Sequence, residues 1–295
     1  MANSIVCFGE VLWDVFPTHK KIGGAPLNVA LRLKSFDHDV SMISSVGDDD
    51  LGQDILDFAL MRGLNDKYIQ KSDQFQTGEV QVTLDEKGSA SYEIVYPKGW
   101  DDIQTTETNK QLVKDSDAFI FGSLVARGET SRDTLFHLLK EASYKIFDIN
   151  LRPPHYDLSV LDRLMQEADF IKFNDDELFE ISEGMGSEFT SIENNMKFIS
   201  EQTKTDRICV TKGGDGAVLL YDGKFYHNKG YPIKVADTVG AGDSFLATLT
   251  HQLLSGQDPQ KAIDYACAVG AMVAGSEGAN PEISANDIEM FIDSH

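Results

Sequence analysis

Short apolar runs alternate with segments of helical spacing along most of the chain. The apolar runs predict buried strands at Ser4–Phe8, Val40–Ser45, Ala118–Phe121, Lys145–Ile149, Phe170–Phe173 and Arg207–Thr211. The helical spacing predicts helices at Leu27–Phe36, Leu51–Arg62, Thr130–Glu141, Leu158–Ala168, Gly242–Ser255, Pro259–Ala274 and Ser284–Asp293. This alternation is typical of an α/β protein with three layers, α/β/α, and a mostly parallel central sheet.

One stretch follows the two-residue period of an antiparallel hairpin instead. Thr77–Leu84 and Ser89–Tyr96 each alternate apolar and polar residues, and Asp85-Glu86-Lys87-Gly88 lies between them as a turn. Within a chain of parallel units, such a hairpin predicts a flap that projects from the main sheet. An antiparallel edge of the same sheet is the alternative.

Length and composition are those of a globular protein. The 295 residues suit one large α/β domain with a small appendage, and 41% hydrophobic and 25% charged residues are ordinary values. We therefore predict a single domain over 1–295, with a β-lid contributed by about 77–98 and part of 10–22.

The charge balance excludes two classes of partner. The chain has 26 basic and 48 acidic residues, a formal net charge of −22, and no basic run. This excess repels nucleic acids and anionic membranes. The sequence starts without a leader pattern and has no apolar run long enough to span a membrane, so we expect a cytoplasmic protein. Cys7, Cys209 and Cys267 lie far apart in apolar runs and are predicted to be buried, reduced thiols.

The richest chemical pattern is DTVGAGDSF at Asp237–Phe245. Gly240, Ala241 and Gly242 are small enough for the backbone to approach a ligand closely. The helix that follows points free N–H groups and its positive dipole end at this place, which predicts an anion site. A carboxylate beside an anion, Asp243, makes chemical sense if it takes a proton from a nucleophile that attacks the anion.

An aspartate that caps a helix after a glycine turn would explain the same residues, and this motif alone does not separate the two readings. As the base, Asp243 needs only an ordinary low pKa, because the helix dipole favours its ionised form.

Four motifs together resemble those of the pfkB, or ribokinase-like, family of carbohydrate kinases. They are GGAPLNVA at 23–30, NDDE at 174–177, TKGGDG at 211–216 and DTVGAGDSF at 237–245. They occur in the order and spacing of that family, and the resemblance covers essentially the whole chain. It implies an ATP-dependent sugar kinase in which Asp243 is the base and Gly240, Ala241 and Gly242 hold the transferred phosphate.

The sugar site is expected near the end of the first strand. Asp14 lies beyond the carboxyl end of that strand, where ligands sit in open α/β sheets, and its carboxylate can accept hydrogen bonds from hydroxyls. Asn28 can both donate and accept. The resemblance implies that Asp14, Gly24, Asn28 and Arg152 contact the sugar. The alternatives are a solvated loop acid for Asp14 and a helix-start cap for Asn28.

The resemblance assigns the nucleotide to three segments further along the chain. Asn174 and Glu177 share a helix face and would organise Mg²⁺, through water, together with the phosphates. A capping pair is the alternative. Lys172 would meet a phosphate oxygen, unless it is a solvated lysine. The glycine-rich loop assigned to ATP contains Thr211, Gly213 and Gly216.

A monovalent cation is a further implication of the resemblance. In several family members, backbone oxygens in two loops hold such an ion, for example K⁺. The first loop corresponds to Asp237 and Val239 in this chain, and the second corresponds to Val273–Gly278.

The acceptor expected from the resemblance is fructose, phosphorylated on its 6-hydroxyl. The motifs around Asp14, GGAPLNVA and DINLR at 148–152 match the fructokinase branch. Many fructokinases carry an arginine after the aromatic residue at position 96, where this chain has Pro97 and then Lys98. Lys98 is not equivalent to an arginine for bidentate contacts. A kinase for 2-keto-3-deoxygluconate is therefore the alternative, with Arg152 or Lys98 as the cation for its carboxylate.

Two other classes of protein are weighed against a kinase. A non-catalytic, sugar-sensing relative would not need Asp243 or the glycine loop, and both are intact. A dinucleotide-dependent oxidoreductase would need a glycine fingerprint after the first strand, which is missing. The apolar face of the hairpin needs a cover, either from its own domain or from a second subunit, and we predict a homodimer.

Overall fold

The computed structural model describes residues 2–84 and 90–295, and its largest feature is a nine-stranded sheet. The strand order is β13-β12-β11-β10-β9-β8-β1-β4-β5. In chain order these strands are β1 (Ser4–Phe8), β4 (Asp39–Gly47), β5 (Ile69–Ser72), β8 (Ala118–Gly122), β9 (Lys145–Asp148), β10 (Phe170–Asn174), β11 (Arg207–Thr211), β12 (Ala217–Tyr221) and β13 (Lys224–Asn228). Neighbouring strands are parallel except at β11–β12 and β12–β13. The predicted mostly parallel sheet is confirmed.

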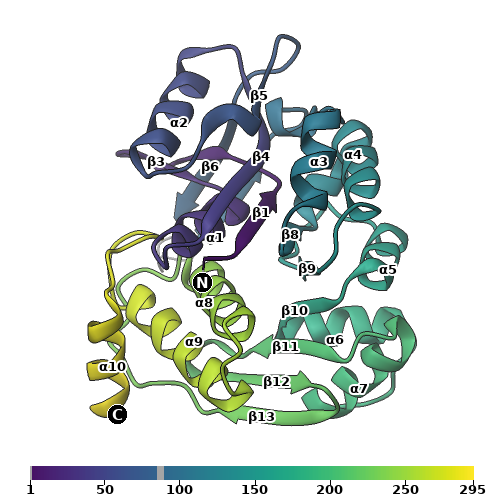
Figure 1. The fold of residues 1–295 in the computed structure, drawn as a ribbon, viewed down its shortest axis with the longest axis vertical. Helices are drawn as coiled ribbons and strands as arrows, with labels where there is room; N and C mark the ends of the chain where they lie inside the picture. The colour runs from purple at the N-terminus through teal and green to yellow at the C-terminus, as the bar shows by residue number, and fades with distance from the viewer. Residues whose placement is uncertain (1, 85–89) are drawn as a thin grey trace.

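Helices cover both faces of this sheet (Figure 1). One face carries α1 (Ala25–Lys34), α2 (Asp50–Met61), α8 (Ala241–Leu254) and α9 (Pro259–Ala274), with α10 (Ala285–Asp293) packed on α9. The other face carries α3 (Glu107–Lys114), α4 (Glu129–Leu139), α5 (Leu158–Glu167), α6 (Asp175–Gly184) and α7 (Ile192–Thr203). The three-layer α/β/α architecture is therefore confirmed. No helix in the described part of the chain is long and apolar enough to cross a membrane.

Two cores hold the layers together, and the strands divide their side chains between them. Ile5 and Cys7 of β1 pack with the helices of one face, whereas Val6 and Phe8 pack with those of the other. Because successive side chains of a strand point to opposite faces, a continuous apolar run serves both cores. The three cysteines are all buried.

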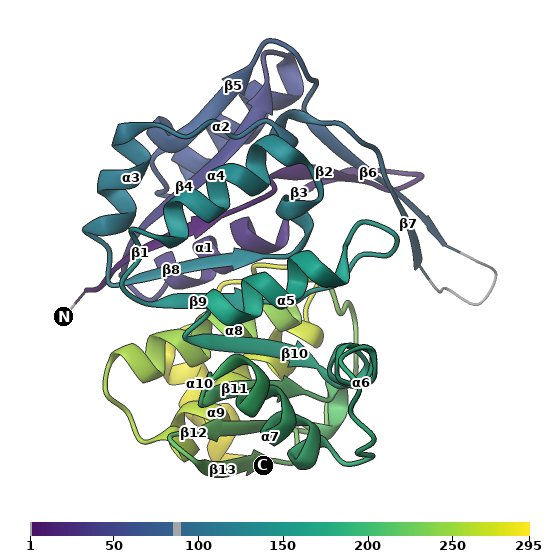
Figure 2. The same ribbon diagram turned by 90° about the vertical axis from the view of Figure 1, so that its right-hand side faces the viewer.

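A second, four-stranded sheet stands beside the carboxyl edge of the first. Its order is β3-β2-β6-β7. Its strands are β2 (Leu12–Val15), β3 (Lys20–Gly23), β6 (Gly78–Leu84) and β7 (Ala90–Ile94). The hairpin β6–β7 joins this sheet through parallel pairing of β6 with β2, and the sheet extends away from the main body (Figure 2). The predicted turn at 85–88 and the side chains of 82–92 lie outside the described residues.

One buried arginine fixes the base of the hairpin to the main body. Arg127 follows β8, forms an ion pair of 2.8 Å with Asp101, and stacks 3.8 Å above the ring of Trp100. Its guanidinium also donates to the backbone oxygen of Val95 at 2.8 Å, just beyond β7. The cation is therefore paired and stacked, and the hairpin leaves the main body from a fixed point.

Candidate active site

A cavity of about 560 Å³ lies between the carboxyl edge of the main sheet and the second sheet. The loops after β1, β8, β9, β10 and β11 contribute to its wall, as do the N-termini of α1 and α8. The predicted site residues that line it are Asp14, Gly24, Asn28, Arg152, Lys172, Asn174, Thr211, Gly213, Gly216, Val239, Gly240, Ala241, Gly242 and Asp243. Glu177 and Asp237 are not among the residues that line it.

The N-terminus of α8 opens into the cavity without a side-chain cap from the described residues. Its N-cap is Gly240, with φ +77°, where any side chain would also run into Ala279. Glycine cannot offer a capping oxygen. The N–H of Ala241 donates to the backbone oxygen of Thr238 at 3.3 Å, and the N–H groups of the next residues of α8 are left for a ligand. The geometry is that of an anion site.

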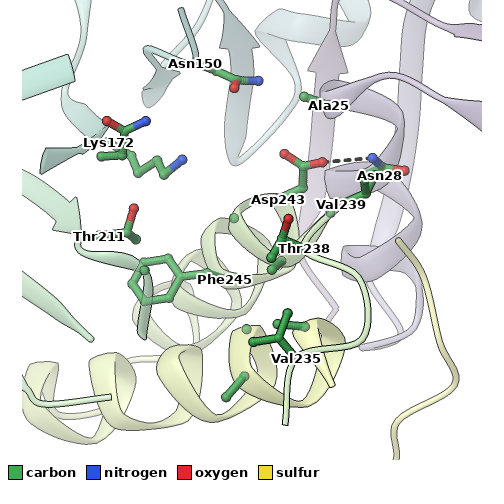
Figure 3. A pocket seen from close by; sticks show the side chains of 18 of the residues that line it. Ala25, Asn28, Asn150, Lys172, Thr211, Val235, Thr238, Val239, Asp243 and Phe245 are labelled. Carbon is green, nitrogen blue, oxygen red and sulfur yellow. Dashed lines mark hydrogen bonds between the residues drawn. The ribbon is translucent and has the colours of Figure 1, made fainter. Parts of the chain in front are cut away.

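Asp243 is the third residue of α8, and its carboxylate bonds to another helix instead of capping its own. Asn28 of α1 donates its side-chain amide to Asp243 Oδ2 at 2.8 Å (Figure 3). Burial raises the pKa of Asp243 to about 6, helped by the negative charge of Asp148 and opposed by Asn28, Lys172 and Arg152. The pKa of Asp243 therefore lies above the ordinary low value, because burial outweighs the effect of the helix dipole here.

Lys172 faces Asp243 across the cavity as a buried cation (Figure 3). It is 6% exposed and its ammonium lies 3.0 Å from Asp148. A Cβ placed on Gly242 would lie 3.5 Å from the lysine Nζ, so the ammonium stands beside the start of α8. The negative charges of Asp148 and Glu177 outweigh the effect of burial and raise the pKa of Lys172. The solvated-lysine alternative is wrong, and a permanent positive charge faces the predicted phosphate position.

The part of the cavity next to the second sheet is lined by one arginine, Arg152, and by three acids, Glu10, Asp14 and Asp243. Burial raises the pKa of Asp14 to about 6 and that of Glu10 to about 7. The charge of Arg152 opposes both shifts and also that of Asp243. Asp14 stands within β2 and lines the cavity, so it is no solvated loop acid. One oxygen of Glu10 is buried without a partner among the described residues.

The start of α1 brings the backbone and Asn28 up to these acids. Gly24 is the N-cap with φ +114°, and a side chain there would collide with the backbone oxygen of Glu10. Asn28 lies one turn inside α1 and is 4% exposed, so the helix-start cap reading is wrong. Lys98, the alternative cation for an acid sugar, is buried outside this cavity, and its charge acts on Asp49.

The start of α6 differs from that of α8, because its own side chains close it. Asn174 accepts from the Glu177 N–H at 2.8 Å, and Glu177 accepts from the Asn174 N–H at 2.8 Å, which is a capping box. The second oxygen of Glu177 accepts from the Leu151 N–H at 2.8 Å. The capping-pair alternative therefore describes the geometry of these two residues, while Asn174 still lines the cavity.

This geometry fits a magnesium ion only in an indirect way. Among residues 2–84 and 90–295, no group of three or more histidine, cysteine or acidic side chains could enclose a metal. Both oxygens of Glu177 already accept backbone hydrogen bonds. Mg²⁺ usually keeps several waters and binds through substrate phosphates. The residues present therefore suit an ion that arrives with a nucleotide and meets Asn174 through water.

A second part of the cavity, here called the apolar slot, is lined mostly by glycines and apolar residues. The loop with Gly213 and Gly216 forms one side, and Thr211 donates its hydroxyl to the backbone oxygen of Phe173 at 3.3 Å. The lining here also includes Gly230, Tyr231, Ile233, Val235, Phe245, Cys267, Gly270, Ala271 and Ala274. A flat, mostly apolar ring would fit such a slot. Sequence reasoning missed the wall at 230–235, since no motif marks it.

Asp237 ties together the two loops expected to hold a monovalent cation. Its carboxylate accepts from the N–H of Val239 at 3.0 Å and from the N–H of Gly278 at 3.3 Å. Its own N–H donates to the backbone oxygen of Ala274 at 3.2 Å. The two loops are therefore adjacent, and ligation of an ion by their carbonyl groups stays a prediction.

Sequence reasoning also missed three polar residues of the site. Glu10 could have been found, because it stands in the same motif as Asp14 directly after the first strand. Asp148 ends β9 just before the predicted Arg152, which is a comparable signal. Asn280, which contacts Asn28, lies in a loop near the C-terminus, and no pattern in the sequence indicates it.

Known proteins resemble this chain over nearly its whole length. A family model for the pfkB family carbohydrate kinases matches residues 2–286. A fructokinase of Escherichia coli is 27% identical over 300 residues, which cover 95% of each chain. A structure of a sugar kinase from Pyrococcus horikoshii in complex with ATP superimposes with a TM-score of 0.81 at 26% identity, covering 93% of each chain. A Vibrio cholerae fructokinase with fructose, ADP and potassium ion bound has a TM-score of 0.85 at 21% identity, covering 99% of this chain and 100% of that one.

Proposed function

The chain belongs to the pfkB family of carbohydrate kinases, and on this premise we propose that it transfers the γ-phosphate of ATP to a primary hydroxyl of fructose, giving fructose 6-phosphate and ADP. One observation carries the proposal. Asp243 is a buried carboxylate at the uncapped start of α8, within a cavity that has an acidic, hydrogen-bonding end and an apolar slot. These are the parts that a sugar, an anion and a purine need.

Asp243 acts as the general base. The sugar hydroxyl gives its proton to the carboxylate while its oxygen forms a bond to the γ-phosphorus, and the bond from that phosphorus to the bridging oxygen of ADP breaks. With a pKa of about 6, Asp243 is mostly ionised at neutral pH and ready to accept the proton. The hydrogen bond from Asn28 holds the carboxylate in place.

The start of α8 and Lys172 stabilise the transferred phosphate. Gly240, Ala241 and Gly242 line the cavity and would hold the phosphate, and the ammonium of Lys172 lies beside Gly242. Preorganised donors of this kind stabilise charge that develops in the transition state. A bound Mg²⁺ would neutralise the nucleotide phosphates, with Asn174 meeting it through water and Glu177 holding Asn174 in position.

Charge at the sugar end favours a neutral acceptor over an acid sugar. Among the described residues, Arg152 is the one cation that acts on Glu10, Asp14 and Asp243 together, and it already faces three acids. Lys98 lies elsewhere. The carboxylate of 2-keto-3-deoxygluconate would thus meet an acidic surface without a free cation among the described residues. Hydroxyls of fructose can donate to these same acids.

The second sheet is proposed to act as the lid over the sugar. Its strands contribute Leu12, Asp14, Val80 and Ile94 to the cavity wall. Three of these side chains are apolar and would exclude water from the phosphate, which prevents hydrolysis of ATP.

The acceptor is tested by measuring ADP release with ATP and a panel of fructose, ribose, glucose, adenosine and 2-keto-3-deoxygluconate. We expect the highest kcat/KM with fructose. A preference of tenfold or more for another acceptor, about 1.4 kcal/mol in transition-state binding, would overturn the acceptor and leave the kinase in place. Repeating the assay in KCl and NaCl tests the cation, and we expect higher activity in KCl.

A further inference from the structure

Two side-chain amides lead in series from a C-terminal loop to Asp243. The Nδ2 of Asn280 donates to Asn28 Oδ1 at 2.9 Å, and the Nδ2 of Asn28 donates to Asp243 Oδ2 at 2.8 Å. We propose that Asn280 is a positioning residue for phosphoryl transfer, which fixes the orientation of the Asn28 amide so that its NH₂ group faces the carboxylate of Asp243. The inference rests on the proposed function, since it takes Asp243 as the base.

The direction of this relay follows from hydrogen-bond chemistry. An ionised carboxylate only accepts hydrogen bonds, so Asn28 must present its NH₂ group to Asp243. The oxygen of Asn28 then faces Asn280, which must present its own NH₂ group. Only one arrangement of both amides satisfies the carboxylate. In this arrangement Asn28 keeps one N–H and one lone pair free, which it can offer to a sugar hydroxyl.

The backbone of the loop is held by residues other than the Asn280 side chain. Arg62 donates to the backbone oxygen of Asn280 at 3.2 Å, and Arg32 donates to that of Pro281 at 2.9 Å. Arg32 is 2% exposed and also donates to Ser244 Oγ in α8 at 3.2 Å. The loop, α1 and α8 are thus cross-linked without the amide of Asn280, so a substitution there should leave the loop in place.

The amide of Asn280 carries a cost that loop packing does not explain. Its Oδ1 is buried and has no partner among the described residues. A buried polar atom without a partner is destabilising, so an apolar side chain would suit a purely structural position better. The contact with Asn28 gives this amide a role.

Loss of the relay should act on the protonation of Asp243. If the Asn28 amide flips, its oxygen faces the carboxylate of Asp243, and this favours the protonated form of Asp243. The other charged groups that act on Asp243 belong to different elements and are untouched by a change at Asn280. They are Glu10, Asp14, Asp148, Arg152 and Lys172.

The experiment compares the pH dependence of kcat/KM for sugar in wild type, Asn280→Asp and Asn280→Ala. Asn280→Asp keeps the shape but reverses the polarity of the relay. We expect its acid limb to move up by about one pH unit, with a loss of about fivefold at pH 6 and recovery to near wild type at pH 8.5. Asn280→Ala should move the acid limb in the same direction, but by less. Asn286→Asp, an exposed change of equal charge in α10, is the control and should match wild type.

Two results would overturn the positioning role. One is an acid limb that coincides with that of wild type in both variants. The other is a loss of the same size at every pH together with a lower Tm, which indicates only a structural contact. Failure of the proposed function would look different, because Asp243→Asn would then keep its turnover. If only the positioning role of Asn280 is wrong, Asp243→Asn still loses its activity.

Discussion

The starts of α6 and α8 both border the cavity, and both helices carry an acid at their third position, yet the two acids do different things. In α6 the N-cap is Asn174, and Glu177 bonds back to the backbone of its own helix start. In α8 the N-cap is Gly240, and Asp243 bonds to a side chain of α1. The first end is closed by its own residues, whereas the second stays open.

The difference comes from the residue at the N-cap. An asparagine supplies an oxygen for the first N–H groups and makes the reciprocal bond from the third residue favourable. A glycine supplies none, so the first N–H groups of α8 after Ala241 and the second oxygen of Asp243, Oδ1, are left for a ligand. An acid in the first turn is therefore evidence of catalysis only where the cap is missing.

The largest effect is expected from Asp243→Asn, which should lower kcat by about 10²–10⁴ because it removes the base while keeping the shape. The folded pKa of about 6 lies above the unfolded value of 3.8, so the buried carboxyl favours folding only when protonated, below about pH 4. This contribution is lost as the pH rises through about 6. The variant should therefore melt higher than wild type at pH 8 but not at pH 4.

Kinetics and melting curves on the same purified samples check this prediction. A helix-capping role would give the reverse pattern, with activity per folded molecule preserved and stability lowered by about 1 kcal/mol. Turnover within about fivefold of wild type in a variant that melts normally would place the base elsewhere.

The contrast between the two helices also marks the limit of sequence reasoning. The GAGD spacing predicts an anion site with an acid beside it, and the order of strands and helices places Asp14, Asn174 and Thr211 at one edge of the sheet. These are local patterns. The contact of Asn28 with Asp243 joins positions 215 residues apart, so only the packing of α1 against α8 creates it.

Electrostatics were the hardest property to predict from the chain. Whether Lys172 is solvated or buried depends on its neighbour Asp148, which comes from another strand. The raised pKa of Asp243 depends on burial that no spacing reports. Motifs identify the chemical groups of this site, and the fold decides their charge.

The second prediction tests whether Asp14 contacts the sugar acceptor. Asp14 comes from β2 and lines the same cavity as Asp243. Asp14→Ala should raise the KM for sugar at least tenfold, because charged hydrogen bonds contribute roughly 1.5–3 kcal/mol each. The KM for ATP should change little. An unchanged sugar KM in a folded variant would remove Asp14 from the sugar site.

The third prediction concerns the closed helix. Glu177→Ala leaves the N–H groups of Asn174 and Leu151 without their acceptor, so stability should fall by about 1–3 kcal/mol. The fold-decrease in kcat should be at least about tenfold smaller than the fold-decrease caused by Asp243→Asn, because Glu177 acts through Asn174 and does not accept the proton of the sugar hydroxyl. Chemical denaturation and kcat measure the two effects. If Glu177→Ala keeps normal stability but loses as much activity as Asp243→Asn, the two acids are equally important for catalysis, and the contrast between the two helices is wrong.

The smallest effect is expected at the far end of α8, which is also held by side chains from outside the helix. The N–H of Asn3 donates to His38 Nδ1 at 3.1 Å, so His38 carries its proton on Nε2 and donates it to His251 Nδ1 at 2.8 Å. The ring of His251 stacks on Phe36, with 4.5 Å between centroids. Burial, with a smaller effect of His38, lowers the pKa of His251 from 6.5 to about 4.

A lowered pKa means that the unfolded chain binds the proton first. The pair therefore contributes its full stability above about pH 6.5 and loses it as the pH falls toward 4. His251→Gln keeps an acceptor for His38 but cannot titrate. Between pH 7 and pH 5 the Tm of this variant should therefore fall less than the Tm of wild type, and the two losses should differ by at least about 2 °C. His137→Gln removes an exposed imidazole from α4 and should leave the pH dependence unchanged. If His251→Gln and wild type lose stability in parallel, acid acts on another part of the molecule. If they diverge, α8 is fixed by partners from other elements at both ends, whereas α6 is closed at its start by its own cap.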